Sequence, residues 1–198
     1  MKTPIARLAA AFLLAALAGC AGISGESAPS AQATNAVTRS TEPGERFITF
    51  VGPRRPTGEP FLGVTGTNFA ALRSSIDTKT GEAVHQLYVE DSYFGAERNW
   101  DAARDPAGKA LRFIAISNNQ ISCDNGCAYA EEFAASLPEA LLRASRQGLA
   151  ISFTARSGAQ QTILVPGDLI ATQLAAIDEA RASLSTASAA AAPASARR

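Results

Sequence analysis

The first twenty residues restrict where this chain can fold. Lys2 and Arg7 give a basic start, and the run Leu8–Leu17 (LAAAFLLAAL) is apolar without a break. A basic start, a short apolar run and small residues after it are typical of a secretory signal peptide. The run is too short to cross a bilayer as a helix, which needs about 20 apolar residues. We therefore expect residues 1–19 to be a cleaved signal peptide, with a short buried or amphipathic helix as the alternative.

The signal peptide ends on Leu17-Ala18-Gly19-Cys20, which resembles the lipobox of bacterial lipoproteins. The resemblance covers these first twenty residues and implies lipidation of Cys20, with a diacylglyceryl group on its sulfur, cleavage before it and acylation of the new amine. One acyl chain binds a bilayer weakly, whereas two or three anchor a protein stably. Ala21, where an inner-membrane lipoprotein carries aspartate, implies the outer membrane. The implied partner is thus a lipid bilayer, with the domain facing the periplasm.

Two segments of low complexity flank the rest of the chain. Residues 20–45 are rich in Ala, Ser, Gly, Thr and Pro and contain almost no large apolar side chain. Such a segment cannot bury enough surface to offset its ordering entropy, so it predicts a flexible tether behind the lipid anchor. Residues 183–198 are Ala- and Ser-rich and predict a disordered tail. One folded domain is expected over residues 46–182.

The charge balance excludes one class of partner. Removing residues 1–19 leaves 16 basic and 18 acidic residues, so the remaining chain has a net charge of −2. A binder of nucleic acid would instead carry a basic patch or a basic excess. We therefore expect no nucleic-acid partner.

The domain is expected to be α+β, mostly antiparallel sheet with two short helices packed on one face. Runs rich in β-branched and aromatic residues, bounded by turn residues, predict the strands. They cover Phe47–Val51, Thr67–Asp77, Glu82–Ser92, Ala110–Ser117, Ala128–Leu137, Leu149–Ala155 and Gln161–Val165.

Helical spacing replaces the strand pattern at two places. Ser136 can cap a first helix, Pro138 fits its first turn, and Gly148 can close it. Pro166-Gly167-Asp168 opens a second helix. Its apolar face is formed by Leu169, Ile170, Leu174 and Ile177.

Cys123 and Cys127 flank Asp124-Asn125-Gly126. In an exported protein such a pair predicts a disulfide, and Asn-Gly readily adopts the tight turn that brings the two cysteines together. A zinc site needs four ligands, for which His85 is the remaining soft candidate, and redox pairs use a C-x-x-C spacing. Those two alternatives stay open beside the disulfide, which would hold one turn rather than the whole fold.

No catalytic, metal or cofactor motif is found, so we expect no catalytic residues, no metal and no cofactor. His85 is the one side chain with an ordinary pKa near neutrality, but no strained serine turn of the G-x-S-x-G type accompanies it. The carboxylate pairs Glu90-Asp91 and Glu131-Glu132 are neighbours in strands, so the members of each pair point to opposite faces. An active site assembled from distant residues stays open.

Aromatic side chains gather around the predicted loop before residue 100. Tyr88, Tyr93, Phe94 and Trp100 could line a groove for a ligand or peptide, or they could cap the edge of the core. We treat these four residues as the candidate binding loop.

One further resemblance covers about 60 residues. Cys123-x3-Cys127, Leu141-Leu142, Gly148–Phe153 and Thr162–Val165 together look like the C-terminal half of the invasion-associated locus B family. That family consists of secreted, β-rich bacterial envelope proteins, and the resemblance implies a similar fold without an assigned enzymatic activity. The lipobox departs from the family's pattern.

Together these features predict an envelope lipoprotein that binds or supports another envelope protein without catalysis. Contact through an edge strand or the loop near Trp100 is expected. The alternatives are a hydrolase acting on envelope polymers, with His85 or a dispersed carboxylate pair as base, and a purely structural lipoprotein.

Overall fold

The computed structural model describes residues 36–41, 44–124 and 126–191 as one α+β domain, which confirms the predicted fold class. Cys20, the predicted signal peptide and most of the predicted tether lie outside the described residues.

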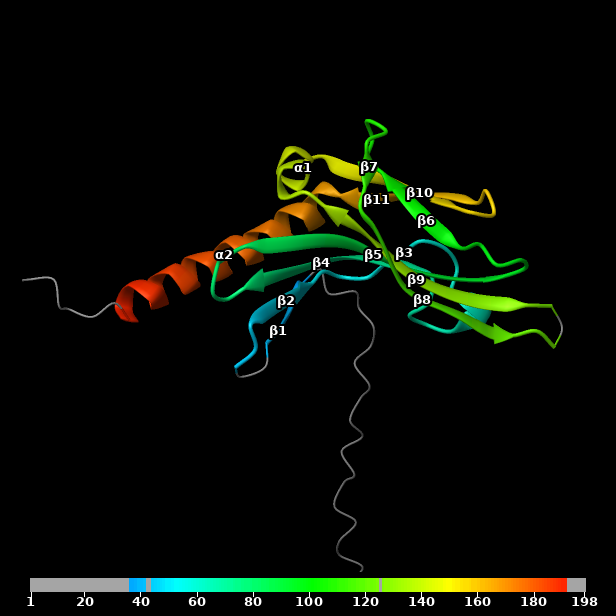
Figure 1. The fold of residues 1–198 in the computed structure, drawn as a ribbon, viewed down its shortest axis with the longest axis horizontal. Coiled ribbons are helices and arrows are strands. Elements are labelled where there is room, and N and C mark those ends of the chain that lie inside the picture. The colour runs from blue at the N-terminus through cyan, green and yellow to red at the C-terminus, as the bar shows by residue number, and fades with distance from the viewer. Residues whose placement is uncertain (1–35, 42–43, 125, 192–198) are drawn as a thin grey trace, which may run out of the picture. The chain divides into compact units, whose positions relative to one another are not determined.

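The larger sheet, sheet A, contains seven antiparallel strands among the described residues (Figure 1). Their order is β1-β2-β4-β5-β9-β8, and β3 pairs with β4 beyond the end of β2. The strands are β1 (Thr38–Ser40), β2 (Phe47–Val51), β3 (Arg55–Pro56), β4 (Phe69–Asp77), β5 (Ala83–Phe94), β8 (Phe113–Ser122) and β9 (Ala128–Leu137). The 3-10 turn η1 (Phe61–Gly63) lies in the loop between β3 and β4.

The smaller sheet, sheet B, has the order β11-β10-β6-β7 in the described part of the chain. Its strands are β6 (Trp100–Arg104), β7 (Ala110–Leu111), β10 (Gly148–Ala155) and β11 (Gln160–Pro166), all paired antiparallel. Because β6 follows β5 and β7 leads into β8, the chain passes from sheet A to sheet B and back again.

Apolar side chains of the two sheets form a common core. Phe133 of β9 contacts Phe153 of β10 edge to face, with ring centroids 5.0 Å apart, and Trp100 of β6 packs on the same Phe133 ring. Leu87 and Val89 of β5 and Leu149 and Ile151 of β10 are completely buried in this cluster. The alternation of buried residues along β5 and β10 follows the two-residue period of a strand.

Helix α2 (Gly167–Ala191) packs against both sheets and against α1 (Glu139–Ala144), along β2 and β4 on one side and β10 and β11 on the other (Figure 1). Ile170 and Leu174 belong to the main core. One turn later, a second apolar cluster is formed by Ile177 and Ala180 with Ile48, Phe50 and Ile76. In the part of the chain that the structure describes, neither helix has the length and apolar character of a membrane span.

Several predicted boundaries need correction. The domain begins earlier than residue 46, because β1 lies in the predicted tether and pairs with β2 through its backbone although its side chains are exposed. At the other end, α2 continues through the predicted tail to Ala191, since alanine is the best helix former. Ser136 does not cap α1: it belongs to β9, and α1 begins after Pro138 without a side-chain cap.

Two strand predictions also change. β6 was not predicted, because its residues WDAAR have little intrinsic strand preference and pair with the distant β10. The predicted strand Ala110–Ser117 is divided into β7 of sheet B and the start of β8 of sheet A.

Candidate functional site

Strand β8 forms one edge of sheet A and, among the described residues, pairs with β9 alone. Its sequence, FIAISNNQIS, contains no charged residue and no proline over ten positions. Edge strands of natural sheets are usually blunted by charge, proline or shortness, because their unpaired N–H and C=O groups can pair with another chain. Two bulges against β9 are the one protective feature that β8 has. β8 therefore offers a long, uncharged edge.

An open cleft of about 310 Å³ lies beside this edge, between sheet A and sheet B. From sheet A it is lined by Phe113, residues 115–118 of β8 and residues 131–133 of β9, and from the other side by Asn99, Trp100 and Arg156. The cleft thus brings the edge strand together with Trp100, one of the four predicted binding-loop residues.

Trp100 is held rigidly in the wall of the cleft. The residue is 6% exposed, and its Nε1 donates a hydrogen bond of 2.8 Å to Oδ2 of the buried Asp91. The same carboxylate accepts two hydrogen bonds from Nη1 of Arg98, at 2.6 and 2.8 Å. Asp91 is on β5 of sheet A and Arg98 is in the connection from β5 to β6. This ion pair therefore fixes that connection to sheet A.

Glu131 on β9 fixes the backbone of the same connection. Its buried carboxylate accepts hydrogen bonds from the backbone N–H groups of Asn99 (3.0 Å) and Trp100 (3.1 Å) and from the hydroxyl of Tyr93. The Tyr93 oxygen in turn accepts the N–H of Arg98 at 2.7 Å. Burial and the hydrogen bond to Glu131 raise the pKa of Tyr93 above its usual range, so the phenol remains a donor. The cleft is therefore preorganised on this side.

Polar side chains frame the opening of the cleft. Asn118 of β8 donates from Nδ2 to Oε1 of Glu97 at 2.6 Å, which links the edge strand to the loop before β6. Arg156 is largely exposed and pairs with Asp101 at 3.2 Å. The opening can thus hydrogen-bond a polar group, while Phe113, Phe133 and Trp100 supply apolar surface.

The four aromatic residues predicted as one binding loop do not line one surface. Tyr93 and Trp100 are buried on the side of sheet A that faces sheet B. Tyr88 packs against Phe69, with ring centroids 5.7 Å apart, and Phe94 packs against Phe61 at 4.8 Å. Since successive strand residues alternate between faces, Tyr88 and Phe94 point to the face opposite Tyr93. Of the four, Trp100 alone lines the cleft.

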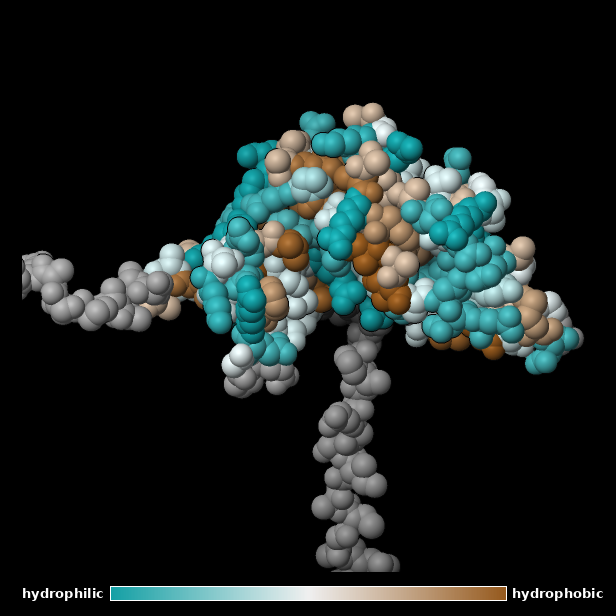
Figure 2. All heavy atoms as spheres, in the orientation of Figure 1, coloured by the Kyte–Doolittle hydropathy of each residue, from teal (hydrophilic) through white to brown (hydrophobic). Residues whose placement is uncertain are grey.

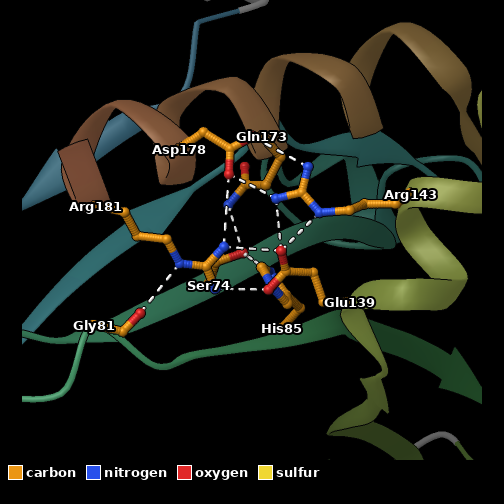
Figure 3. A network of polar contacts seen from close by, with 8 residues as sticks. All are labelled: Ser74, Gly81, His85, Glu139, Arg143, Gln173, Asp178 and Arg181. Carbon is orange, nitrogen blue, oxygen red and sulfur yellow. Dashed lines mark hydrogen bonds and ion pairs between the residues drawn. The ribbon is translucent and has the colours of Figure 1, made fainter.

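A second polar cluster lies around His85, which is 2% exposed (Figure 3). Ser74 of β4 is opposite His85 of β5 in the strand register, and its Oγ is 2.8 Å from His85 Nδ1. Nε2 of the same ring is 3.5 Å from Oε2 of Glu139 on α1. A serine, a histidine and a carboxylate are therefore in contact, as a hydrolase would require.

The hydrogen-bond directions in this cluster follow from one carbonyl and one carboxylate. Gln173 of α2 contacts the backbone oxygen of Phe50 at 3.2 Å through its Nε2, which must donate. The same Nε2 donates to Ser74 Oγ at 3.0 Å, and the Glu139 carboxylate facing His85 Nε2 favours a proton on that ring nitrogen, so Nδ1 accepts the Ser74 hydroxyl proton. His85 is then neutral, with its proton on Nε2 and directed at Glu139.

The charge state of the cluster agrees with these directions. Burial lowers the pKa of His85 from its ordinary value, and the nearby Glu139 carboxylate offsets this only in part. Hydrogen bonds from Arg181 above all, and from Arg143 and His85, hold the pKa of Glu139 well below its usual range. Neutral imidazole and ionised carboxylate are thus the forms present near neutral pH.

This arrangement fastens α2 to sheet A and does not present a nucleophile. Ser74 is 2% exposed, and the clefts around Trp100 and between α1 and α2 include neither Ser74 nor His85 in their walls. Glu139 also accepts hydrogen bonds from both terminal nitrogens of the Arg181 guanidinium, and Arg143 forms an ion pair with Asp178 (Figure 3). The Ser74 oxygen is buried beneath α2, whose Gln173 donates a hydrogen bond to it.

The sulfurs of Cys123 and Cys127 are at disulfide distance, in the turn between β8 and β9. The predicted lipidation site, Cys20, lies outside the described residues. Within the described residues, no group of His, Cys, Asp and Glu side chains is arranged to hold a metal ion.

The two predicted carboxylate pairs are separated as their strand positions require. Asp91 faces Trp100, whereas Glu90 on the other face accepts hydrogen bonds from the N–H of Asn68 and the hydroxyl of Ser92. Glu131 likewise binds the connection to β6, whereas Glu132 hydrogen-bonds Tyr88 on the opposite face. Burial is the larger cause, and the Glu132 carboxylate the next, of a pKa of Tyr88 raised to about 12.

Sequence reasoning missed most members of the His85 cluster and did not single out β8. The absence of charge across Phe113–Ser122 was a readable sign of an unprotected edge. No local pattern indicates that Ser74, Glu139 and Gln173 meet at His85.

Comparison of the chain with known protein families, with curated proteins and with solved structures finds no match in any of the three. The likeness to the lipobox and the likeness to the invasion-associated locus B family therefore stay predictions made from the residues alone.

Proposed function

We propose that this chain is a lipid-anchored bacterial envelope protein, and that its domain binds an extended segment of another envelope protein along β8. The uncharged edge of β8 beside a preformed cleft is the observation that supports the binding role. The residues Leu17–Cys20, at the end of an apolar run, support the anchor. The proposed place is the outer membrane, with the domain facing the periplasm.

Strand addition explains why both features occur together. Backbone hydrogen bonds to a free edge provide affinity without reading the sequence of the partner, whereas a pocket beside the edge selects one of its side chains. The cleft lined by Phe113 and Trp100 lies beside residues 115–118 of β8. A partner segment paired with β8 could place one side chain there. Because β8 carries no charge, a segment without charged residues fits it best.

The anchor is tested by replacing Cys20. The Cys20→Ala chain should lose its acyl groups and leave the membrane fraction, and Cys123→Ala is the matched control that should remain there. Membrane association of Cys20→Ala equal to that of the unaltered chain would contradict the lipid anchor.

The binding role is tested by site-specific photocrosslinking in intact cells. A photoreactive residue at Gln120, exposed on β8, should give a discrete adduct, whereas one at Leu164, 68% exposed on β11, should not. Asn119→Lys places a charge on the edge and should remove the adduct from Gln120 without unfolding the domain. An adduct that forms equally at Leu164, or that survives Asn119→Lys, would contradict strand addition.

The two alternatives make different predictions. A hydrolase that uses Ser74 would need an exposed hydroxyl, and burial of Ser74 under α2 argues against that role. A purely structural lipoprotein would be anchored through Cys20 yet give no specific adduct at Gln120. The same pair of experiments therefore separates the binding role from the structural one.

A further inference from the structure

The loop between β3 and β4 projects an apolar apex from one end of sheet A. Leu62 and Val64 in this loop are 70% and 55% exposed, and Phe94 at the end of β5 is 60% exposed. Phe61 joins them, with its ring centroid 4.8 Å from that of Phe94. Figure 2 shows hydrophobic surface along the lower edge of the domain, at the end where β8 and β9 lie. We call Phe61, Leu62, Val64 and Phe94 the apolar apex.

The loop that carries the apex is held in one conformation. Thr67 Oγ1 accepts the N–H of Phe61 at 2.8 Å and donates to the carbonyl of Val64 at 2.7 Å, which closes the loop on itself. Asn68 donates from Nδ2 to the carbonyl of Glu59 and accepts the N–H of Ser92, which fixes the base of the loop to β5. The apolar side chains are thus presented outward by a built loop.

Leu62 sits in a conformation that a branched side chain rarely adopts, with φ of +53°. A left-handed residue other than glycine costs about 1–2 kcal/mol and is kept where the surrounding structure imposes it. Leu62 also has the highest exposed fraction among the large apolar residues that the structure describes. A leucine that is held in this conformation and exposed to water suggests that its side chain contacts an apolar environment outside the domain.

The shape of the apex fits a bilayer better than a folded partner. An added Cβ at Gly63 would meet no atom within 4 Å, and none of the clefts described above is lined by Leu62, Val64 or Phe94. A projecting apex without a groove needs no complementary surface in a fluid lipid phase. Arg54, stacked over Phe69 at 4.4 Å beside Gly66, places a cation next to the apolar residues, where it can meet lipid phosphate.

The length of the chain before the domain places lipid nearby. Fifteen residues separate Cys20 from residue 36, where the described domain begins. Fifteen residues reach at most about 50–55 Å even when fully extended. An acylated Cys20 would therefore keep the domain close to the headgroups at all times.

We infer that the apolar apex inserts into the interface of the bilayer to which the chain is anchored, and so orients the domain on the membrane. This inference rests on the proposed lipid anchor at Cys20. The apex then makes a second, non-covalent membrane contact, which leaves β8 at a defined height above the lipid.

The test places a fluorescent reporter in the apex of the full acylated chain. Leu62→Trp and, separately, Val64→Trp are reconstituted into vesicles of phosphatidylethanolamine and phosphatidylglycerol, with and without brominated acyl chains. Leu164→Trp, on the exposed face of sheet B, is the matched control. The emission of the buried native Trp100 is measured on the unaltered chain and subtracted.

Insertion should make bromine quenching of the apex reporters roughly twofold or more stronger than that of Leu164→Trp, because interfacial apolar groups lie about 5–10 Å into the headgroup and acyl boundary. Flotation of the same samples reports the anchor independently. Chains that float with the vesicles but show equal quenching at all three positions would overturn the membrane contact and leave the anchor intact. Chains that do not float would contradict the anchor itself.

Discussion

Ser74 and His85 lie directly opposite each other on β4 and β5, and their side chains meet at 2.8 Å beneath α2. The contact lies between the main core around Leu174 and the second apolar cluster around Ile177. Because Gln173 reaches the same serine from α2, a single buried hydroxyl joins the helix to two strands. A buried polar group in this position costs stability whenever one of its partners is removed.

Replacing Ser74 by alanine should therefore destabilise the domain. The change leaves His85 Nδ1 without its donor and removes one acceptor of Gln173, both in a buried site. We expect the free energy of unfolding to fall by about 1–3 kcal/mol, measured by urea denaturation. Ser75→Ala is the matched control, because Ser75 points to the other face and makes only a long, 3.3 Å contact with Thr49. An equal loss of unfolding free energy in both variants would show that the loss does not come from the hydrogen bonds of Ser74 to His85 and Gln173.

The same cluster predicts that the domain is sensitive to mild acid. The pKa of His85 is lower in the folded chain than its ordinary value of 6.5, so the unfolded chain takes up a proton first as the pH falls. The unfolded state then binds more protons than the folded state, and the free energy of unfolding decreases as the pH drops below about 6.5. Glu139, whose pKa is also lowered, adds a loss of the same sign below about pH 4.5.

His85 is the single histidine of the chain, so the loss between about pH 6.5 and 5 can be assigned to it. Urea denaturation at several pH values should show this loss in the unaltered domain and a much flatter profile in His85→Gln. If His85→Gln loses as much stability across this range as the unaltered domain does, the assignment to His85 is wrong.

The sequence predicted those elements whose own residues prefer the structure they adopt. β2 and β9 have the predicted bounds, Phe47–Val51 and Ala128–Leu137, because alternation and β-branched or aromatic residues are visible locally. β1 and β6 could not be predicted in this way, because their residues have weak strand preference and are held by backbone pairing with distant strands. The extension of α2 to Ala191 was underestimated, because a segment rich in Ala and Ser resembles a tail by composition.

The four aromatic residues of the predicted binding loop do not share one surface. Trp100 lines the cleft, whereas Tyr88 and Phe94 lie on the opposite face of sheet A, since strand periodicity separates them from Tyr93. The His85 cluster joins residues separated by 11, 54 and 99 positions, counted from Ser74 to His85, His85 to Glu139 and Ser74 to Gln173. Contacts of that range depend on the topology, which a single sequence does not reveal.

The cysteine pair predicts a local effect of reduction. A closed loop of five residues restricts the unfolded chain by about 2 kcal/mol in the chain-entropy model, so the double variant Cys123→Ser/Cys127→Ser should fold with at most a loss of that size. Thiol labelling of the denatured, unreduced protein should find neither cysteine free. Complete labelling of both would show that the bond is not formed, and unfolding of the double variant would show that it holds more than one turn.

Replacing Glu131 by glutamine should loosen the wall of the cleft. The carboxylate accepts hydrogen bonds from two backbone N–H groups and the Tyr93 hydroxyl, whereas an amide has one acceptor oxygen and brings an N–H₂ group that faces these donors. We expect a loss of about 1–3 kcal/mol in the free energy of unfolding. Because Trp100 is the single tryptophan of the chain, its emission should shift to the red as its backbone is released.

Glu90→Gln is the matched control, since Glu90 is also a buried carboxylate that accepts a backbone N–H and a hydroxyl, but it lies on β5 and is not among the residues that line the cleft. It should leave the Trp100 emission unchanged. If the cleft beside β8 receives a partner side chain, Glu131→Gln should also weaken the photocrosslink from Gln120, whereas Glu90→Gln should not. A red shift in Glu131→Gln with an undiminished crosslink would mean that the partner pairs with the edge of β8 alone and does not use the cleft.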